Sequence, residues 1–559
     1  MTELGHGRPG VELLLDFLED AGVEVIFGNP GTLEQSFMAA LSSRPGLSYM
    51  LALHETVAVA MADGYARAAG RIGFVNVHIL PGLANALSQV YNAQKHRSPL
   101  VITAGQSQAH MLIQEPLLSA DTVSIARQHT KWAWELRSSM DVVPALRRAF
   151  KVARSAPPGP VFLSLPLDLL DQLTSEPRDP RPAVRVMARS IPEPGAVMAA
   201  ASAIRDARHP VILCGDDIGS ARATTEATRL AETMGAEVFA VGQCEVGFPN
   251  NHPQFVRTLN VNAAGAGAHL EAADVVVVLG TPLFMQLIDP GEPILPPRAA
   301  VIHVDDSGVE AGKNIPSDFA LNGDLGLAID ALNAALQDTM TASENDSAAG
   351  RRQELAANKA AQLHRLEGRI ESARLDSRIT PLGLMAALHD RVPADCVIVE
   401  EAPSEASALH QAFSFSTPGT LFGNRGGALG WGLPAALGVQ VAMPGRAVVA
   451  ILGDGAANYS IQGLWTAAHH RLPVKFVICN NRSYQILKSN LASYMPDLDI
   501  SRLIGMDLVD PEIDFVSLAR GYGVAARRVQ DHAELGDALS ATLQEPGPAL
   551  IDVALGAAG

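Results

Sequence analysis

The sequence has few of the features that mark secreted, membrane-spanning or nucleic-acid-binding proteins. Its 559 residues include only four cysteines, and these are widely separated, so packed thiols are expected in place of disulfides or a metal cluster. The apolar run at residues 273–280 is far too short to span a bilayer, and the N-terminus lacks the pattern of a signal peptide. A net charge of −17 argues against nucleic acid or an anionic membrane as a partner. We therefore expect a soluble, cytoplasmic protein.

Short apolar strands alternate with helical patterns in three segments of the chain, which is typical of parallel α/β sheets. The apolar content of 48% is ample for large cores. The predicted fold class is α/β with three domains, each a parallel sheet flanked by helices. The predicted boundaries are 8–180, 193–338 and 379–556, with 339–378 as a linker that becomes helical.

The most informative stretch begins with Gly-Asp-Gly at residue 453 and ends with Asn-Asn at residue 481. A strand at 447–452 would deliver Asp454 to its carboxyl end. A helix of about 13 residues is expected from Asn458, and a second strand at 474–479 would return beside the first. A crossover of this length suits a right-handed βαβ unit.

This unit would place Asp454 beside Asn480 and Asn481. One carboxylate, one amide oxygen and a loop carbonyl form a hard, half-filled oxygen shell, which suits Mg²⁺ completed by phosphate oxygens and water. The N-terminus of the following helix favours the same anionic group. The stretch therefore predicts a site for a metal and a phosphorylated cofactor.

A GDG followed about two dozen residues later by NN resembles the diphosphate motif of the thiamine diphosphate (ThDP) enzymes. A second match lies far away: GNPGT at 28–32 and LALHETVAVAMADGYARAAG at 51–70 are similar to the pyrimidine-binding half of that family. The resemblance covers nearly the whole chain. It implies a pyrimidine-binding domain, a central Rossmann-like domain and a diphosphate-binding domain, of which the outer two share a fold.

The resemblance implies ThDP and Mg²⁺, or Ca²⁺, as cofactors, with Asp454, the Asn481 side chain and the Ser483 carbonyl as metal ligands. Gly427 matches the position whose carbonyl receives the cofactor's 4′-amino group, and Leu429 matches the residue that wedges the cofactor into its bent shape. The other residues assigned to the cofactor by the resemblance are Asn29, Pro30, Gly31, Glu55, Pro403, Ser404, Gly453, Gly455, Ala456, Tyr484, Gln485 and Ile486.

Glu55 is the strongest catalytic candidate. In the family, a glutamate at this position hydrogen-bonds the aminopyrimidine ring, and a carboxylate can share a proton with a ring nitrogen. His78, in NVHILPG, matches a histidine that relays protons in benzoylformate decarboxylases, whose motifs look most like those of this chain. Thr32 stands where those enzymes have serine, and its added methyl would narrow the pocket.

Two departures bear on the reaction. Benzoylformate decarboxylases carry a second catalytic histidine in the middle domain, and residues 280–291 contain no histidine. Gln114 stands where acetolactate synthases and 2-hydroxyacyl-CoA lyases often have an active-site glutamine, which favours carboligation. The first βα turn of the central domain, CGDDIGSA, lacks the G-x-G-x-x-G spacing, so FAD or another dinucleotide is not expected there.

Three functions therefore stay open. The leading one is decarboxylation of a 2-oxo acid to an aldehyde, as by benzoylformate decarboxylase. The alternative is a carboligase, acetolactate synthase-like enzyme or 2-hydroxyacyl-CoA lyase, and the third is a catalytically silent homologue, against which Glu55 and the metal ligands count. The expected partners are a small 2-oxo acid and further copies of the chain in a dimer or homotetramer, because in the family the pyrimidine domain of one subunit faces the diphosphate domain of another.

Overall fold

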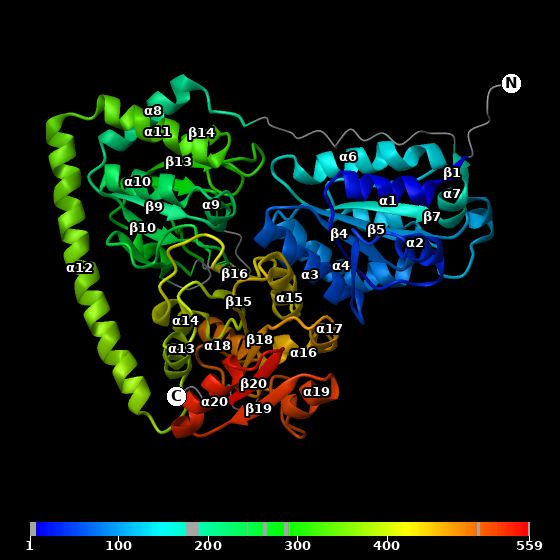
Figure 1. Ribbon diagram of the computed structural model, residues 1–559. Helices are drawn as coiled ribbons and strands as arrows, with labels where there is room; N and C mark the ends of the chain where they lie inside the picture. Colours follow the sequence, from blue (N-terminus) through cyan, green and yellow to red (C-terminus); the bar gives the residue numbers. More distant parts are fainter. Residues whose placement is uncertain are drawn as a thin grey trace.

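The computed structural model describes residues 7–174, 189–242, 244–260, 265–283, 289, 291–499 and 503–556. Within them the chain forms three six-stranded parallel sheets flanked by helices, so the predicted α/β class is confirmed (Figure 1). The predicted boundary at residue 180 lies outside the described residues. The four cysteines are free thiols, as expected. No helix in the described part of the chain is long and apolar enough to cross a membrane.

The N-terminal sheet has the strand order β3-β2-β4-β5-β7-β6. Its strands are β2 (Val25–Gly28), β3 (Ser48–Leu51), β4 (Gly73–Val77), β5 (Leu100–Gln106), β6 (Ala133–Glu135) and β7 (Val161–Pro166). Its helices are α1 (Gly10–Asp20), α2 (Gln35–Leu41), α3 (Glu55–Ala69), α4 (Ile79–Lys95), α5 (Thr122–Arg127), α6 (Val142–Arg154) and α7 (Leu167–Asp171). A short antiparallel pair, β1 (Arg8–Pro9) and β8 (Leu173–Thr174), joins the two ends of this domain.

The C-terminal sheet has the order β16-β15-β17-β18-β20-β19, which repeats the order of the N-terminal sheet strand for strand. The outer two domains therefore share a fold. The strands are β15 (Val397–Glu401), β16 (Leu421–Gly423), β17 (Val448–Gly453), β18 (Lys475–Asn480), β19 (Ala525–Val529) and β20 (Ala549–Ala554). The helices are α13 (Pro381–His389), α14 (Ala406–Ala412), α15 (Gly432–Ala442), α16 (Asp454–Asn458), α17 (Gly463–His469), α18 (Gln485–Tyr494), α19 (Phe515–Gly521) and α20 (His532–Leu543).

The central sheet has the order β11-β10-β9-β12-β13-β14, which is the Rossmann order 3-2-1-4-5-6. Its inner strand β12 is the fully buried run VVVVL, as expected for a parallel strand covered on both faces. The strands are β9 (Pro210–Cys214), β10 (Glu237–Ala240), β11 (Phe255–Thr258), β12 (Val275–Leu279), β13 (Ala300–Asp305) and β14 (Phe319–Asn322). The helices are α8 (Pro194–Arg205), α9 (Asp216–Ser220), α10 (Thr224–Met234) and α11 (Leu325–Thr339).

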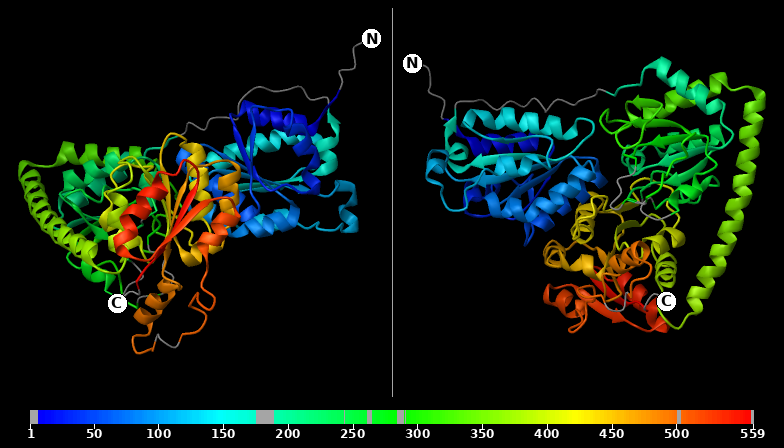
Figure 2. Two further views of the ribbon diagram at one scale, coloured as in Figure 1. Left: turned by 60° about the horizontal axis from the view of Figure 1, so that its bottom comes forward. Right: turned by 180° about the vertical axis from the view of Figure 1, so that it is seen from behind.

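A single helix, α12 (Ala342–Leu375), leads from the central domain to the C-terminal domain. It runs along the outside of the molecule, as Figure 1 and the right-hand view of Figure 2 show. Its capping box, in which Thr341 and Glu344 exchange hydrogen bonds, fixes its start.

The N- and C-terminal domains pack on each other through α3 and α15. A Cβ on Gly438 would lie 1.8 Å from the Met61 carbonyl oxygen, and one on Gly64 would lie 2.2 Å from the Ala435 carbonyl oxygen. Only glycine allows the two backbones to come this close. One continuous apolar core therefore extends across both domains, and it includes the fully buried Trp431.

The predicted helix of about 13 residues from Asn458 is wrong. The chain enters α16 directly after β17, with Asp454 as the first helical residue, and after a turn it forms α17. The Gly455 amide donates to Asp454 Oδ1, which stabilises this early start. The turn ends at Gly463, where a Cβ would lie 2.6 Å from Leu433 of α15.

Candidate active site

The carboxylate of Glu55 is buried and held at both oxygens. Glu55 is the first residue of α3, follows the end of β3 and is 6% exposed. Asn29, after β2, donates to its Oε1 at 3.2 Å, and Asn85, on α4, donates to its Oε2 at 3.0 Å. His54 caps α3 by accepting from the Thr56 amide at 3.2 Å. The orientation of the Glu55 carboxylate is thus fixed by two amides, of which Asn85 was not foreseen from the sequence.

His78 forms a pair with Glu34, a residue that the sequence analysis missed. His78 lies between β4 and α4, and its Nδ1 is 2.7 Å from Glu34 Oε2. Glu34 is 2% exposed and also accepts from the amides of Gly31 and Gly105, at 2.9 and 2.8 Å. A carboxylate only accepts, so Nδ1 carries the hydrogen and Nε2 is left for another partner. The available signal was the glutamate three residues after Gly31, at the start of a short helix.

Tyr49, on β3, lies near both carboxylates of this edge. Its hydroxyl is buried and has no hydrogen-bond partner among the described residues. Burial, with the charges of Glu34 and Glu55, raises the pKa of Tyr49 above its ordinary value. A Cβ on Gly28 would lie 2.2 Å from this hydroxyl, so the glycine of GNPG makes room for it. The phenol is therefore neutral and lies within the influence of two acidic side chains.

The second half of the site lies at the carboxyl ends of β17 and β18. Asp454 is 3% exposed, and its Oδ2 is buried without a hydrogen-bond partner in the described part of the chain. Burial raises the pKa of Asp454 to about 6, although the amides of Gly455, Arg482 and Ser483 oppose the rise. An orphaned carboxylate oxygen of this kind is where a cation would be held.

The loop after β18 carries the other two predicted ligands, Asn481 and Ser483, and the Ser483 amide faces the Asp454 carboxylate. Asn481 Oδ1 accepts from the Ser483 amide at 3.1 Å, and its Nδ2 is 3.3 Å from Glu405 Oε1. Asn480, by contrast, donates to Asp552 at 2.9 Å. No cluster of three or more His, Cys, Asp and Glu side chains suited to a metal occurs in the described residues. A metal here would take one carboxylate, one amide oxygen and one carbonyl, which suits Mg²⁺.

Three further buried glutamates surround this half. Burial raises the pKa of Glu400 and Glu401 to about 7 and that of Glu405 to about 8. Glu401 accepts from the amides of Trp431 and Gly432, at 3.2 and 2.8 Å, which fixes the start of α15. Pro403 and Ser404, predicted to contact the cofactor, lie in the turn between Glu401 and Glu405. A bound cation would favour the ionised forms of these acids.

The loop that carries Gly427 and Leu429 is held by α4. Gly427 has φ +79°, in the left-handed region that glycine tolerates. Asn92 donates to the Ala428 carbonyl at 2.8 Å, and Gln89 donates to the Leu429 carbonyl at 3.1 Å. The same helix supplies Asn85 to Glu55, so α4 contacts both halves of the site.

Four other predicted site residues, Thr32, Gln114, Gln485 and Ile486, lie outside these hydrogen-bonded groups. Gln114 ends an exposed 3₁₀ helix (Ala109–Gln114) and is itself exposed, near Ile113 and Leu117, which are each 88% exposed. Thr32 is exposed at the start of the short 3₁₀ helix that also contains Glu34, and Gln485 and Ile486 begin α18. Within the described chain, no hydrogen bond or ion pair joins Glu55 or His78 to the metal-binding candidates. Residues 284–288 and 290, in the segment without a histidine, lie outside the described residues.

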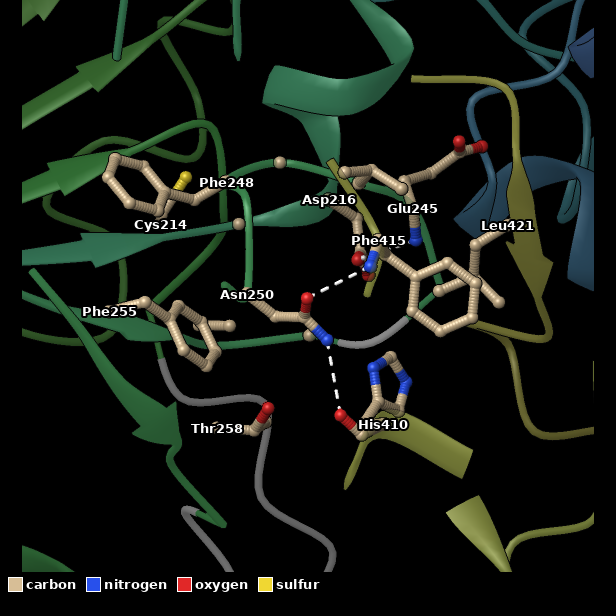
Figure 3. Close-up of a pocket in the computed structure, with 15 residues that line it drawn as sticks. Cys214, Asp216, Glu245, Phe248, Asn250, Phe255, Thr258, His410, Phe415 and Leu421 are labelled. Atoms are coloured by element: carbon tan, nitrogen blue, oxygen red, sulfur yellow. Dashed lines mark hydrogen bonds between the residues drawn. The ribbon is translucent and has the colours of Figure 1, made fainter. Parts of the chain in front are cut away.

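The carboxyl edge of the central sheet is closed by side chains of the central domain and by His410, Phe415 and Leu421 of the C-terminal domain (Figure 3). Asp216 accepts from the amides of Cys244 and Glu245 at 2.9 and 3.1 Å, and a Cβ on Gly242 would lie 2.5 Å from its carboxylate. Asn250 bridges to the C-terminal domain by donating to the His410 carbonyl at 3.1 Å. The remaining cavity has a volume of about 30 Å³, far below that of a nucleotide site.

Comparison with known proteins matches all three domains. The N-terminal TPP binding, central and C-terminal TPP binding domains of thiamine pyrophosphate enzymes match residues 8–125, 197–332 and 404–553. Benzoylformate decarboxylase of Pseudomonas aeruginosa is 32% identical, covering 96% of this chain and 97% of that protein. A putative acetolactate synthase large subunit, IlvX, of Mycobacterium tuberculosis is also 32% identical, covering 97% and 98%.

Solved structures of ThDP enzymes have the same fold as this chain. The ThDP-dependent 4-hydroxybenzoylformate decarboxylase of Rhodococcus jostii RHA1 superposes with a TM-score of 0.85 at 28% identity, covering 98% of this chain and 99% of that one. Benzoylformate decarboxylase of Polynucleobacter necessarius gives 0.85 at 28% identity, covering 98% of each chain. The three matched domains and the site residues at both sheet edges lead to one conclusion: the chain belongs to the thiamine pyrophosphate enzyme family and is a ThDP-dependent enzyme.

Proposed function

We propose that the protein is a ThDP- and Mg²⁺-dependent lyase that decarboxylates an aryl 2-oxo acid of the benzoylformate type to an aldehyde. The observation that carries this proposal is the His78–Glu34 pair on the same sheet edge as the buried Glu55. It combines a proton-transferring imidazole with a carboxylate suited to the cofactor's pyrimidine ring. Two relatives named for aryl 2-oxo acids, in Pseudomonas and Rhodococcus, support the substrate class.

Asp454, Asn481 and the Ser483 carbonyl would hold the metal and, through it, the diphosphate. When bound, ThDP supplies the carbon nucleophile and electron sink that cleavage next to a carbonyl requires. Glu55 would hold a proton at the pyrimidine ring, since Asn29 and Asn85 orient its carboxylate. The 3% exposed Asp454 and its orphaned Oδ2 support this assignment of the metal.

His78 would orient the substrate carboxylate and move a proton at Nε2. Glu34 accepts a hydrogen bond from Nδ1, so the neutral ring is held in the tautomer whose Nε2 carries no hydrogen. Nε2 is then free to face the substrate and to take up a proton. The buried charge of Glu34 also stabilises the imidazolium that forms when Nε2 takes up a proton. One histidine would thus serve steps that benzoylformate decarboxylases divide between two.

A second candidate, carboligation, is favoured by one sequence observation. Residues 280–291 contain no histidine, so protonation of the substrate-derived carbon after loss of CO₂ would be slow. A second carbonyl compound could then react in place of the proton. The acetolactate synthase relatives fit this branch, whereas Gln114 is exposed in the single chain, and no hydrogen bond joins it to Glu55 or His78 among the described residues.

The working unit would be a dimer or a tetramer. Support comes from the described chain, in which no hydrogen bond or ion pair joins Glu55 or His78 to the metal-ligand candidates Asp454, Asn481 and Ser483. The 88% exposed side chains of Ile113 and Leu117, beside the predicted site residue Gln114, suit burial by a second copy.

The substrate class can be tested by supplying the holoprotein with benzoylformate, 4-hydroxybenzoylformate, pyruvate and a branched aliphatic 2-oxo acid. CO₂ release and products would be measured separately for each acid. We expect the aryl acids to give the highest kcat/KM. A preference for pyruvate with acetolactate as product would replace this proposal by the second candidate.

A further inference from the structure

A large cavity lies away from the candidate active site, where all three domains meet. Its volume is about 910 Å³, which is the size of a site for a small organic ligand. The N-terminal domain contributes the end of α3 and residues 96–99. The central domain contributes Gly219, Ser220, Arg222, Thr224, Thr225 and Glu245, and the C-terminal domain contributes residues 416–419, Phe422, Met443 and Arg446.

The lining of this junction cavity is strongly basic. Five arginines line it, and Glu245 is the one carboxylate among its described lining residues. The five are Arg67, Arg97, Arg154, Arg222 and Arg446. Glu245 is already paired with Arg67 at 2.7 Å, and Arg97 is paired with Asp217 at 3.0 Å. Arg97 is also paired with Asp306 at 2.6 Å and Asp305 at 3.4 Å, so its charge is neutralised by carboxylates outside the lining.

Two of these arginines present unneutralised charge. The side chain of Arg222 is exposed and forms no hydrogen bond or ion pair in the described structure. Arg446 donates to the carbonyl oxygens of Asp395 and Gly419 and has no carboxylate partner among the described residues. Guanidinium groups in this state suit phosphate oxygens, which they can contact in pairs.

The backbone adds to the same preference. Helix α10 begins at Thr224, and its N-cap residue, Ala223, has no side chain that could accept from the first-turn amides. Thr224 and Thr225 of this first turn line the cavity, where a helix N-terminus favours an anion, although Glu226 lies in the same turn. Hydroxyl groups of Thr225, Ser416 and Thr417 line the same space, and Pro418 and Met443 give it an apolar wall.

We propose that the junction cavity binds a small phosphorylated metabolite, of the size of a sugar bisphosphate or a mononucleotide, at a site separate from that for ThDP. Inorganic phosphate would leave most of the volume and the apolar wall unused. Because residues of all three domains line the cavity, the ligand would bridge them and raise the thermal stability of the chain.

Calorimetric titration of the protein saturated with ThDP and Mg²⁺ tests this proposal. The probes are fructose 1,6-bisphosphate, AMP and inorganic phosphate. We expect one of the two organic phosphates to bind once per chain and to raise the melting temperature, and the probe that binds identifies the class. The variant Arg222→Asn/Arg446→Gln should weaken binding by about tenfold or more. Asparagine is chosen because Arg222 has φ +56°, which asparagine tolerates.

The control variant is Arg365→Asn/Arg369→Gln, which removes the same charge from the exposed face of α12. It should bind the probe as the unmodified protein does. The proposal is overturned if neither organic phosphate binds at about 1 mM, or if only inorganic phosphate binds. Equal weakening by the control variant, or equal binding by the cavity variant, would also overturn it.

Discussion

The imidazole of His78 and the carboxylate of Glu34 lie 2.7 Å apart, Nδ1 to Oε2, at the carboxyl edge of the N-terminal sheet. Glu34 is almost fully buried, and two backbone amides also hold its oxygens. The pair therefore sets which nitrogen of His78 carries the hydrogen.

Replacing Glu34 should impair His78 without removing it. We expect Glu34→Gln to lower kcat by about tenfold or more and to shift the pH profile of kcat, because the amide cannot stabilise the imidazolium. His78→Ala should lower kcat by about 100-fold. Steady-state kinetics over a pH series would measure both effects.

Glu135→Gln is the matched control for this experiment. Glu135 accepts from Ser164 at 2.9 Å and Gln106 at 3.3 Å in the same domain, and no histidine of the described chain is hydrogen-bonded or ion-paired to it. Its variant should retain the pH profile of the unmodified protein. If Glu34→Gln kept both kcat and the pH profile, Glu34 would not position His78.

The two adjacent asparagines after β18 should differ sharply. Asn481 accepts from the amide of Ser483, a residue whose amide also faces the Asp454 carboxylate, whereas the Asn480 side chain donates to Asp552. Asp454→Ala and Asn481→Ala should lose ThDP and Mg²⁺ together on dialysis against a chelator, because neither cofactor completes its site alone. Asn480→Ala should keep ThDP and Mg²⁺, and circular dichroism would check that this variant remains folded. Full retention by Asp454→Ala would show that the anchor is elsewhere.

The sequence identified these residues because their spacing carries chemistry. GDG and NN are short motifs that follow strands. The number of residues between them therefore predicted both strands of the βαβ unit. Glu34, Asn85 and Gln89 were missed because their roles depend on which distant backbone they touch. The split between α16 and α17 was missed because it depends on the packing of Gly463 against α15, which no local pattern encodes.

A buried histidine should make stability depend on pH. His96 is fully buried; its Nδ1 bonds to Asp63, and its Nε2 accepts from the Arg425 amide at 2.9 Å. Burial lowers the pKa of His96 from 6.5 to about 4. Between these values the unfolded chain takes up a proton that the folded chain does not, so stability falls as the pH drops from 6.5 to 4.

The expected loss from His96 over this range is about 3 kcal/mol in the free energy of unfolding. His96→Gln keeps one donor and one acceptor and removes the titration, so its stability should change less with pH. Urea midpoints at pH 7, 6, 5 and 4 would compare the two proteins. Identical pH dependence would assign the acid lability to other groups.

Complementation tests whether the site lies between two chains. Glu55→Gln and Asp454→Ala chains should each be inactive alone. When co-expressed and purified as a mixed dimer, they should regain activity, because one of the two sites then combines an intact pyrimidine half with an intact diphosphate half. Well-formed mixed dimers without activity would place the whole site within one chain.

The proposed division of the chemistry is tested most directly by the products formed from benzoylformate with and without acetaldehyde. Residues 280–291 supply no second histidine, so His78 alone is expected to transfer the proton and benzaldehyde release should be slow. An added acceptor should therefore raise total turnover by forming a 2-hydroxy ketone. His78→Ala should slow benzaldehyde release further. Rapid decarboxylation that neither the acceptor nor His78→Ala changes would contradict the account.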